Sequence, residues 1–149
     1  MFKVLNGDIF KSECQIITNP TNSVGVMGKG LALYFKNKFP KETAHFNDYS
    51  LSFQLNFKAF RLMEPILYRN INVLMFPTKI HWIKPSKLEY IQINAQLTKK
   101  LLIKNESPSI AFPALGCGLG GLDFKKVLDI LEKEFNDYDG DVEVYSPNA

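Results

Sequence analysis

Short runs rich in β-branched and aromatic residues recur along the chain and predict strands. They lie at Phe2–Leu5, Gln15–Thr18, Leu62–Tyr68, Ile71–Phe76, Ser109–Leu115 and Val142–Tyr145. The third and fourth runs are separated only by Arg69 and Asn70, which is short enough for a β-hairpin.

Apolar residues at helical spacing predict a helix after the second strand. Leu31, Tyr34, Phe35 and Phe39 share one face of it. Pro40 should end or kink this helix, because proline lacks an amide hydrogen and its ring clashes with the preceding turn.

Two further helices carry start signals. Ser86 followed by Glu89 is a capping box, and the apolar residues Leu88, Ile91, Ala95 and Leu102 follow at helical spacing. Asp123 caps a third helix, whose apolar stripe is Phe124, Val127, Leu128, Leu131 and Phe135. Leu122 and Val127 are placed for a hydrophobic staple around that cap.

Strands interleaved with helices predict a mixed, mostly parallel sheet with helices on both faces, a three-layer α/β/α sandwich. The length of 149 residues favours a single domain spanning 1–149. An apolar share of 46% with 22% charged residues is typical of a packed globule. The net charge of +3 tolerates an anionic ligand or nucleic acid without requiring one.

Cys14 and Cys117 are too few for a disulfide framework or a zinc cluster, so we expect no metal and no cofactor. The opening residues lack the apolar core of a signal peptide, and no stretch approaches the ~20 apolar residues of a membrane span. We therefore expect a cytoplasmic protein with no membrane partner and, by default, a monomer.

A glycine-rich loop follows the second predicted strand, from Asn19 to Gly30. Its amides and the dipole of the next helix favour an anion. It differs from a P-loop, because Gly30 replaces the magnesium-binding Ser or Thr and Ser23 replaces the earlier glycine. A tight turn would account for some of its glycines, but not for the polar Asn19 and Asn22 before them.

A second glycine-rich loop, Gly116–Gly121, joins a predicted strand to the helix at Asp123. Its glycines formally match the dinucleotide fingerprint, but a Rossmann fold needs further strand–helix units and only one more strand is predicted. We expect its backbone to approach a pyrophosphate closely. Since open α/β sheets bind ligands at their carboxyl edge, both loops should meet there around a diphosphate.

Three residues outside the loops carry candidate chemistry. Asp8 either accepts the exocyclic amine of a purine or begins a turn, and the residues alone favour neither. Lys79 is a candidate in the turn that holds His81 and Trp82, although such a lysine is more often only a surface charge. Asp123 has a sufficient role as a helix cap and is left out of the site.

With both loops identified, the chain resembles the macrodomain family from end to end. Asn19 to Asn22 with Gly25–Gly30 is similar to the family's distal-ribose loop, Gly116–Gly121 to its diphosphate loop, and Gly7–Ile9 to its adenine-recognising element. The resemblance implies ADP-ribose binding by Asp8, Ile9, Asn19, Gly25, Val26, Met27, Gly28, Lys29, Gly30, Thr78, Gly116, Cys117, Gly118, Leu119, Gly120, Gly121 and Tyr145.

Within the family, the chain resembles the DarG-type DNA ADP-ribosyl glycohydrolases, which remove ADP-ribose from thymidine in single-stranded DNA. This resemblance rests on Asn22, Val24–Gly30, Phe76–Lys79 with Trp82, and Gly116–Leu122. It implies a metal-independent hydrolase in which Asn22 orients the distal ribose and Lys79 performs the chemistry. It also implies ADP-ribosylated single-stranded DNA as substrate and an ADP-ribosyltransferase toxin as cognate partner. The related terminal ADP-ribose glycohydrolases pair a matching lysine with an aspartate where this chain has Gly120.

Other functions stay open at this point. A module that binds ADP-ribose without cleaving it needs both loops and Asp8, but not Lys79. A hydrolase acting on ADP-ribosylated protein, ADP-ribose 1″-phosphate or O-acetyl-ADP-ribose would share the loops and differ around the distal ribose. On a DNA substrate, His81 or Trp82 could stack on a base beside the modified one.

Overall fold

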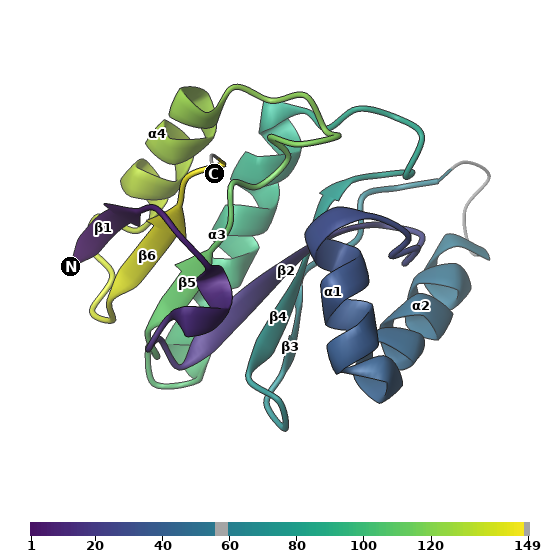
Figure 1. Cartoon of the computed structure of the whole chain (residues 1–149), viewed down its shortest axis with the longest axis horizontal. Coiled ribbons are helices and arrows are strands. Elements are labelled where there is room, and N and C mark those ends of the chain that lie inside the picture. Colours follow the sequence, from purple (N-terminus) through teal and green to yellow (C-terminus); the bar gives the residue numbers. More distant parts are fainter. Residues whose placement is uncertain (56–59, 148–149) are drawn as a thin grey trace.

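The computed structural model describes residues 1–55 and 60–147. Within them, one sheet has the strand order β1-β6-β5-β2-β4-β3 (Figure 1). Its strands are β1 (Phe2–Leu5), β2 (Ile16–Asn22), β3 (Ile66–Tyr68), β4 (Val73–Lys79), β5 (Ile110–Phe112) and β6 (Val142–Tyr145). β3 pairs antiparallel with β4 at the edge, as the predicted hairpin requires, and the other pairings are parallel.

Helices cover both faces of the sheet (Figure 1). α1 (Gly30–Lys38) and α2 (Pro40–Leu55) lie on one face, and α3 (Leu88–Lys104) and α4 (Phe124–Glu134) on the other. A short 3-10 helix, η1 (Ile9–Lys11), follows β1. The predicted three-layer α/β/α sandwich is therefore confirmed.

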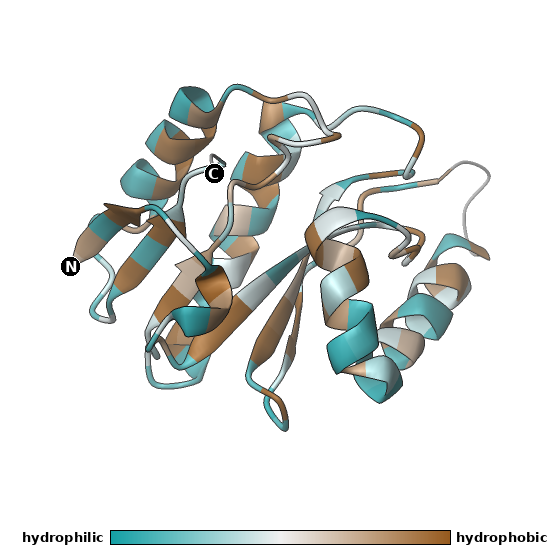
Figure 2. Cartoon of the chain, in the orientation of Figure 1, coloured by the Kyte–Doolittle hydropathy of each residue, from teal (hydrophilic) through white to brown (hydrophobic). Residues whose placement is uncertain are grey.

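The central strands are buried on both faces. Along β4, Leu74 and Phe76 join the apolar cluster beneath α3 and α4, while Val73 and Met75 join the cluster beneath α1 and α2. Successive residues of a strand point to opposite faces, so a strand covered on both sides is continuously apolar. Figure 2 shows this as hydrophobic colouring along the strands and mixed colouring along the helices.

Pro40 separates the first two helices, as predicted. α1 ends at Lys38 with Phe39 as its C-cap, and Pro40 is the first residue of α2. Proline is well tolerated there, because the first amides of a helix have no partner within the helix.

The hydrophobic pattern does not reveal α2, because the face that α2 buries is mostly polar. Its buried residues are Thr43, Phe46, Ser50 and Gln54, at helical spacing. Ser50 Oγ donates to Phe46 O at 2.7 Å, and Gln54 Nε2 donates to Ser23 O at 2.9 Å. The polar groups are therefore buried with hydrogen-bond partners instead of being excluded from the interior.

Several strand limits differ from the prediction. β2 continues to Asn22 instead of ending at Thr18, so Asn19 belongs to the sheet and not to the loop. β5 ends at Phe112, immediately before Pro113, and β3 begins only after Pro65. At these two ends the proline has no amide hydrogen to donate to a neighbouring strand, although Pro20 and Pro77 are accommodated within β2 and β4.

The capping box predicted at Ser86 is wrong, whereas the cap predicted at Asp123 is confirmed. α3 has Lys87 as its N-cap and no side-chain capping bond, which leaves Ser86 outside the helix. The amide of Ser86 instead donates to Gly120 O at 3.1 Å in the second glycine loop. Asp123 accepts from the Lys125 amide at 3.2 Å, and Leu122 packs on the cluster that contains Val127, as the staple requires.

Candidate ligand-binding cleft

A cleft of about 990 Å³ runs along the sheet edge where the parallel strands end. Gly7 follows β1, Asn22 ends β2, Lys79 ends β4, Gly116 lies beyond β5, and Tyr145 ends β6, and all of them line the cleft. Parallel strands deliver their carboxyl ends to one edge, so stretches distant in the sequence meet here.

Asp8 both begins a turn and lines the cleft. It is the N-cap of η1, where Oδ1 accepts from the Phe10 amide at 2.9 Å. Its side chain is exposed beside Ile9 and Tyr145, which pack together in a small apolar cluster. Both interpretations of Asp8 left open by the sequence are therefore compatible with its position.

Asn22 holds the first glycine loop by its side chain. Its Oδ1 accepts from the amides of Val24 and Val26 at 3.1 and 3.2 Å, and its Nδ2 donates to Val26 O at 2.8 Å. Asn22 lies opposite Lys79 in the register between β2 and β4, so the two predicted catalytic residues are neighbours. Both polar atoms of the Asn22 side chain are nevertheless hydrogen-bonded to the loop backbone.

The residues of this loop divide between the cleft and the interior. Val26, Gly28, Lys29 and Gly30 line the cleft. Gly25 has a φ of +78°, and a Cβ on it would lie 2.6 Å from the Cα of Asn47 in α2. α1 follows with Lys29 as its N-cap and without a side-chain capping bond, which leaves its first amides available to an anion.

The second glycine loop presents its backbone to the cleft. Gly118, Leu119 and Gly120 line it, and within the described chain their amides have no hydrogen-bond partner. The loop is closed from inside, because the Leu122 amide donates to Gly116 O at 2.9 Å. Successive free amides of this kind form an anion-binding concavity.

Lys79 lies in the cleft wall between these loops. Its Nζ donates to Trp82 O at 3.0 Å, and partial burial lowers its pKa from the ordinary value. Burial has this effect because it disfavours the charged ammonium. Ser23 fixes the backbone of Lys79 from the neighbouring strand, since its amide donates to Lys79 O at 3.0 Å.

Most of the predicted site residues are brought together in the cleft. They are Asp8, Ile9, Asn22, Val26, Gly28, Lys29, Gly30, Thr78, Lys79, Gly116, Gly118, Leu119, Gly120 and Tyr145. Asn19, Gly25, Met27, Cys117 and Gly121 do not line it.

Each exception has a structural reason. Asn19 is fully buried, and its amide nitrogen points to the sulfurs of Met75 and Met27, with Met27 itself in the core. Gly25 packs on α2. Cys117 packs against the apolar cluster beneath α3 and α4, its Sγ donates to Leu115 O at 3.5 Å, and burial, followed by the charge of Asp123, raises its pKa to about 11. The Gly121 amide donates to Gly118 O at 3.1 Å and so closes the loop's turn.

Several further residues line the cleft that were not individually predicted to bind ligand. They are Gly7, Pro20, Thr21, Leu31, Ala32, Trp82, Ile83, Pro113, Ala114, Ser146 and Pro147. Most follow the end of a parallel strand or begin the next helix, so the strand order would have indicated them. Trp82 was part of the resemblance to the DNA-directed branch and was predicted only to stack on a base, not to bind ADP-ribose.

A family model, Macro domain, matches residues 18–131. The chain belongs to this family. The macrodomain is 33% identical over 146 residues to the DNA ADP-ribosyl glycohydrolase of Mycobacterium tuberculosis, covering 97% of this chain and 42% of that protein. It is 32% identical to a DNA ADP-ribosyl transferase–DNA ADP-ribosyl glycohydrolase fusion protein of Thermosipho africanus, covering 97% of this chain and 41% of that protein. This macrodomain therefore spans less than half the length of these curated relatives.

Solved structures support the same family assignment. The macrodomain of Mycobacterium tuberculosis DarG superposes with a TM-score of 0.85 at 30% identity, covering 99% of both chains. Thermosipho africanus DarTG in complex with ADP-ribose gives a TM-score of 0.83 at 32% identity, covering 98% of this macrodomain and 41% of that chain.

Two features are absent from the residues that the structure describes. No helix among them has the length and apolarity to cross a membrane. Nor do they bring together three or more His, Cys, Asp or Glu side chains in the manner of a metal site.

Proposed function

We propose that this macrodomain is a metal-independent ADP-ribosyl glycohydrolase that removes ADP-ribose from thymidine in single-stranded DNA. The observation that carries the proposal is the position of Lys79, a lysine of lowered pKa in the wall of a cleft lined by two amide-rich loops. The names of the related proteins support the same activity, since they are DNA ADP-ribosyl glycohydrolases.

The cleft has a suitable group for each part of ADP-ribose. Asp8, Ile9 and Tyr145 offer a carboxylate and apolar surface for the adenine at one end. The amides of Gly118–Gly120 and the uncapped start of α1 offer donors for the diphosphate. The distal ribose would then reach the end of β4, where Lys79 lies.

The bond to be cleaved joins C1″ of the distal ribose to a nitrogen of the base. Water supplies the oxygen that replaces the base at C1″, and the departing nitrogen takes up a proton. Because burial favours the neutral amine, Lys79 can act as a nucleophile or base at neutral to alkaline pH more readily than an exposed lysine. The groups that fix the diphosphate and the ribose contribute to catalysis, because they hold C1″ beside this amine.

The same relatives support the choice of substrate and partner. The Thermosipho africanus protein joins a DNA ADP-ribosyl transferase to a DNA ADP-ribosyl glycohydrolase in one chain. We therefore propose that a cognate ADP-ribosyltransferase toxin produces the modified DNA that this macrodomain repairs.

The proposal is tested by following release of ADP-ribose from several substrates in parallel. These are single-stranded DNA ADP-ribosylated on thymidine, ADP-ribosylated protein, ADP-ribose 1″-phosphate and O-acetyl-ADP-ribose. We expect turnover of the DNA in the presence of EDTA. Preference for a protein or ester substrate would contradict the DNA assignment, and tight ADP-ribose binding without any turnover would identify a binding module. Loss of turnover in EDTA, restored by magnesium, would contradict metal independence.

A further inference from the structure

Three aromatic side chains form a continuous row that leads from the cleft onto the outer surface. We call Phe60, His81 and Trp82 the aromatic row. The rings of His81 and Trp82 are stacked, with centroids 5.6 Å apart and 30° between their planes. The rings of Phe60 and His81 have centroids 5.4 Å apart. Trp82 lines the cleft, whereas Phe60 does not.

Two rings of the row are exposed, and the turn that carries His81 and Trp82 is closed by hydrogen bonds. Phe60 and Trp82 are each 52% exposed. The turn after β4 is closed by the Lys84 amide, which donates to His81 O at 3.1 Å, and by the Ile83 amide, which donates to His81 Nδ1 at 3.2 Å. Lys79 Nζ donates to Trp82 O in the same turn. Aromatic surface is thus held directly beside the proposed reaction centre.

The charge around the row suits a polyanion. Between Thr78 and Leu88 the chain carries the lysines Lys79, Lys84 and Lys87 and no acidic residue. Lys84 and Lys87 are exposed. Aromatic side chains that stack bases, combined with basic residues that follow a phosphate backbone, are the common features of single-stranded nucleic acid surfaces.

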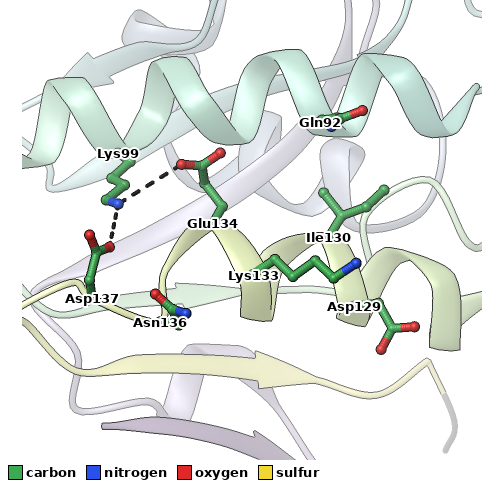
Figure 3. A pocket seen from close by; sticks show the side chains of 8 residues that line it. All are labelled: Gln92, Lys99, Asp129, Ile130, Lys133, Glu134, Asn136 and Asp137. Atoms are coloured by element: carbon green, nitrogen blue, oxygen red, sulfur yellow. Dashed lines mark hydrogen bonds and ion pairs between the residues drawn. The ribbon is translucent and has the colours of Figure 1, made fainter.

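Another part of the surface has a different character. A groove of about 320 Å³ between α3 and α4 is lined by charges of both signs (Figure 3). Lys99 there is paired with Asp137 and with Glu134, and Asp129 adds a further carboxylate. The described residues that line this groove include no aromatic ring, and their three carboxylates outnumber the two lysines, Lys99 and Lys133, so we assign the groove no role in nucleic acid binding.

We propose that the aromatic row is a stacking platform for the nucleotides next to the modified thymidine of single-stranded DNA. This inference rests on the proposed function, which puts the modified base at Lys79. A strand that leaves the cleft along the Trp82 wall then meets His81 and Phe60 in turn, with Lys84 available to a phosphate. The row would make the enzyme select a strand over an isolated modified nucleoside.

Kinetics with a long and a short substrate test the platform. The short substrate is ADP-ribosyl-thymidine, and the long one is an ADP-ribosylated single strand of about ten nucleotides, within the range of known site sizes. Phe60→Ala should raise KM for the long substrate about tenfold, the scale of one lost stacking partner, without changing kcat. Because Phe60 lies outside the cleft, turnover of the nucleoside should not change.

Three further variants sharpen the comparison. Tyr49→Ala removes an aromatic ring of similar exposure, 49%, from α2 and should leave both substrates unaffected. Trp82→Phe should retain more affinity for the long substrate than Trp82→Ala, because a phenyl ring still stacks. An unchanged KM for the long substrate in both Phe60→Ala and Trp82→Ala would overturn the platform while leaving the glycohydrolase intact.

A binding measurement keeps this inference separate from the activity. Trp82 is the only tryptophan of the chain, so its fluorescence reports on the aromatic row and on the cleft wall beside it. Unmodified single-stranded DNA should quench it, Phe60→Ala should weaken that binding, and duplex DNA, whose bases are already stacked, should quench it less. Absence of quenching by the single strand would overturn the platform, even if the protein cleaves no substrate and the proposed function has failed.

Discussion

Lys79 is the residue on which the proposed chemistry depends. Lys79→Ala should retain affinity for ADP-ribose, because the adenine and the diphosphate are bound by other groups. It should lower kcat on ADP-ribosylated single-stranded DNA by about a hundredfold or more, the scale for removing a positioned acid–base or nucleophilic group. Single-turnover release and calorimetric binding separate the two effects. The matched control is Lys126→Ala on the exposed surface of α4. A variant at Lys79 that cleaves at the wild-type rate would remove this lysine from the mechanism.

The protonation state of Lys79 gives a second prediction. Burial lowers its pKa below the ordinary value of 10.5, so the neutral amine becomes populated at lower pH than for an exposed lysine. If the neutral amine reacts, kcat should rise with pH and level off above an inflection that lies below 10.5. The residual activity of Lys79→Ala should lack this inflection. A rate that falls over the same range would show that the ammonium acts instead, as a proton donor.

Asn22 should contribute to the stability of the first glycine loop as well as to ligand binding. Its side-chain amide bonds the backbone of Val24 and Val26, so Asn22→Ala would leave one buried and two partly buried backbone groups without these partners. We expect the free energy of unfolding to fall by about 1–3 kcal/mol, together with weaker ADP-ribose binding. Urea denaturation of the wild type and of Asn22→Asp, which keeps the acceptor oxygen, provides the comparison. Unchanged stability with a loss of kcat alone would mean that Asn22 acts on the ribose directly.

The sequence could predict which loops form the site, but not which way each residue in them points. Asn22 and the glycines mark the first loop clearly. Gly25 and Met27 face inward because α2 packs behind them, and the polar face of α2 hides that helix from the hydrophobic pattern. Asn19 was predicted to lie in the loop but lies in β2 for a related reason, since its side-chain amide is buried against methionine sulfurs. Such contacts depend on elements far along the chain, so no local pattern contains them.

Two glycines of the second glycine loop, Gly118 and Gly120, have different surroundings, although the sequence pattern gave no reason to separate them. A Cβ on Gly118 would meet nothing within 4 Å, whereas one on Gly120 would lie 2.5 Å from both Gly116 O and Ser86 Oγ. Gly118→Val should therefore weaken ADP-ribose binding by standing where the diphosphate approaches, with little change in Tm. Gly120→Val should lower Tm as well, because the loop itself must shift. Equal affinity of Gly118→Val and the wild type would show that the diphosphate does not contact this loop.

Element types were easier to predict from sequence than their limits. The strands of the sheet and the helix capped by Asp123 follow from local spacing and capping chemistry. The start of α3 does not follow from local spacing and capping chemistry. The Ser86 amide donates to Gly120 O in the second glycine loop, and Ser86 does not cap the helix. The Ser86 amide had two possible acceptors, the Glu89 side chain of a capping box and Gly120 O. Tertiary packing selects Gly120 O.

At the scale of the whole molecule, the fold gathers its binding groups before any ligand arrives. All five parallel strands end at the cleft, and the loops after β2 and β5 are held by internal hydrogen bonds. A site built in this way should bind ADP-ribose with little rearrangement, so most of the binding energy should stabilise the folded state.

Ligand-induced stabilisation tests this arrangement directly. At a free ADP-ribose concentration a hundredfold above its Kd, linkage predicts about 2.7 kcal/mol of added stability. Each kcal/mol moves the Tm of a domain of this size by about 2–4 °C, so thermal unfolding should shift upward by about 5–10 °C. AMP should shift Tm less, because it lacks the second phosphate and the distal ribose that reach Gly118–Gly120 and Lys79. Gly118→Val should reduce the shift with ADP-ribose toward that seen with AMP, since it obstructs the diphosphate position alone. If ADP-ribose at high concentration leaves Tm unchanged, the cleft does not bind this ligand and the proposed activity fails with it.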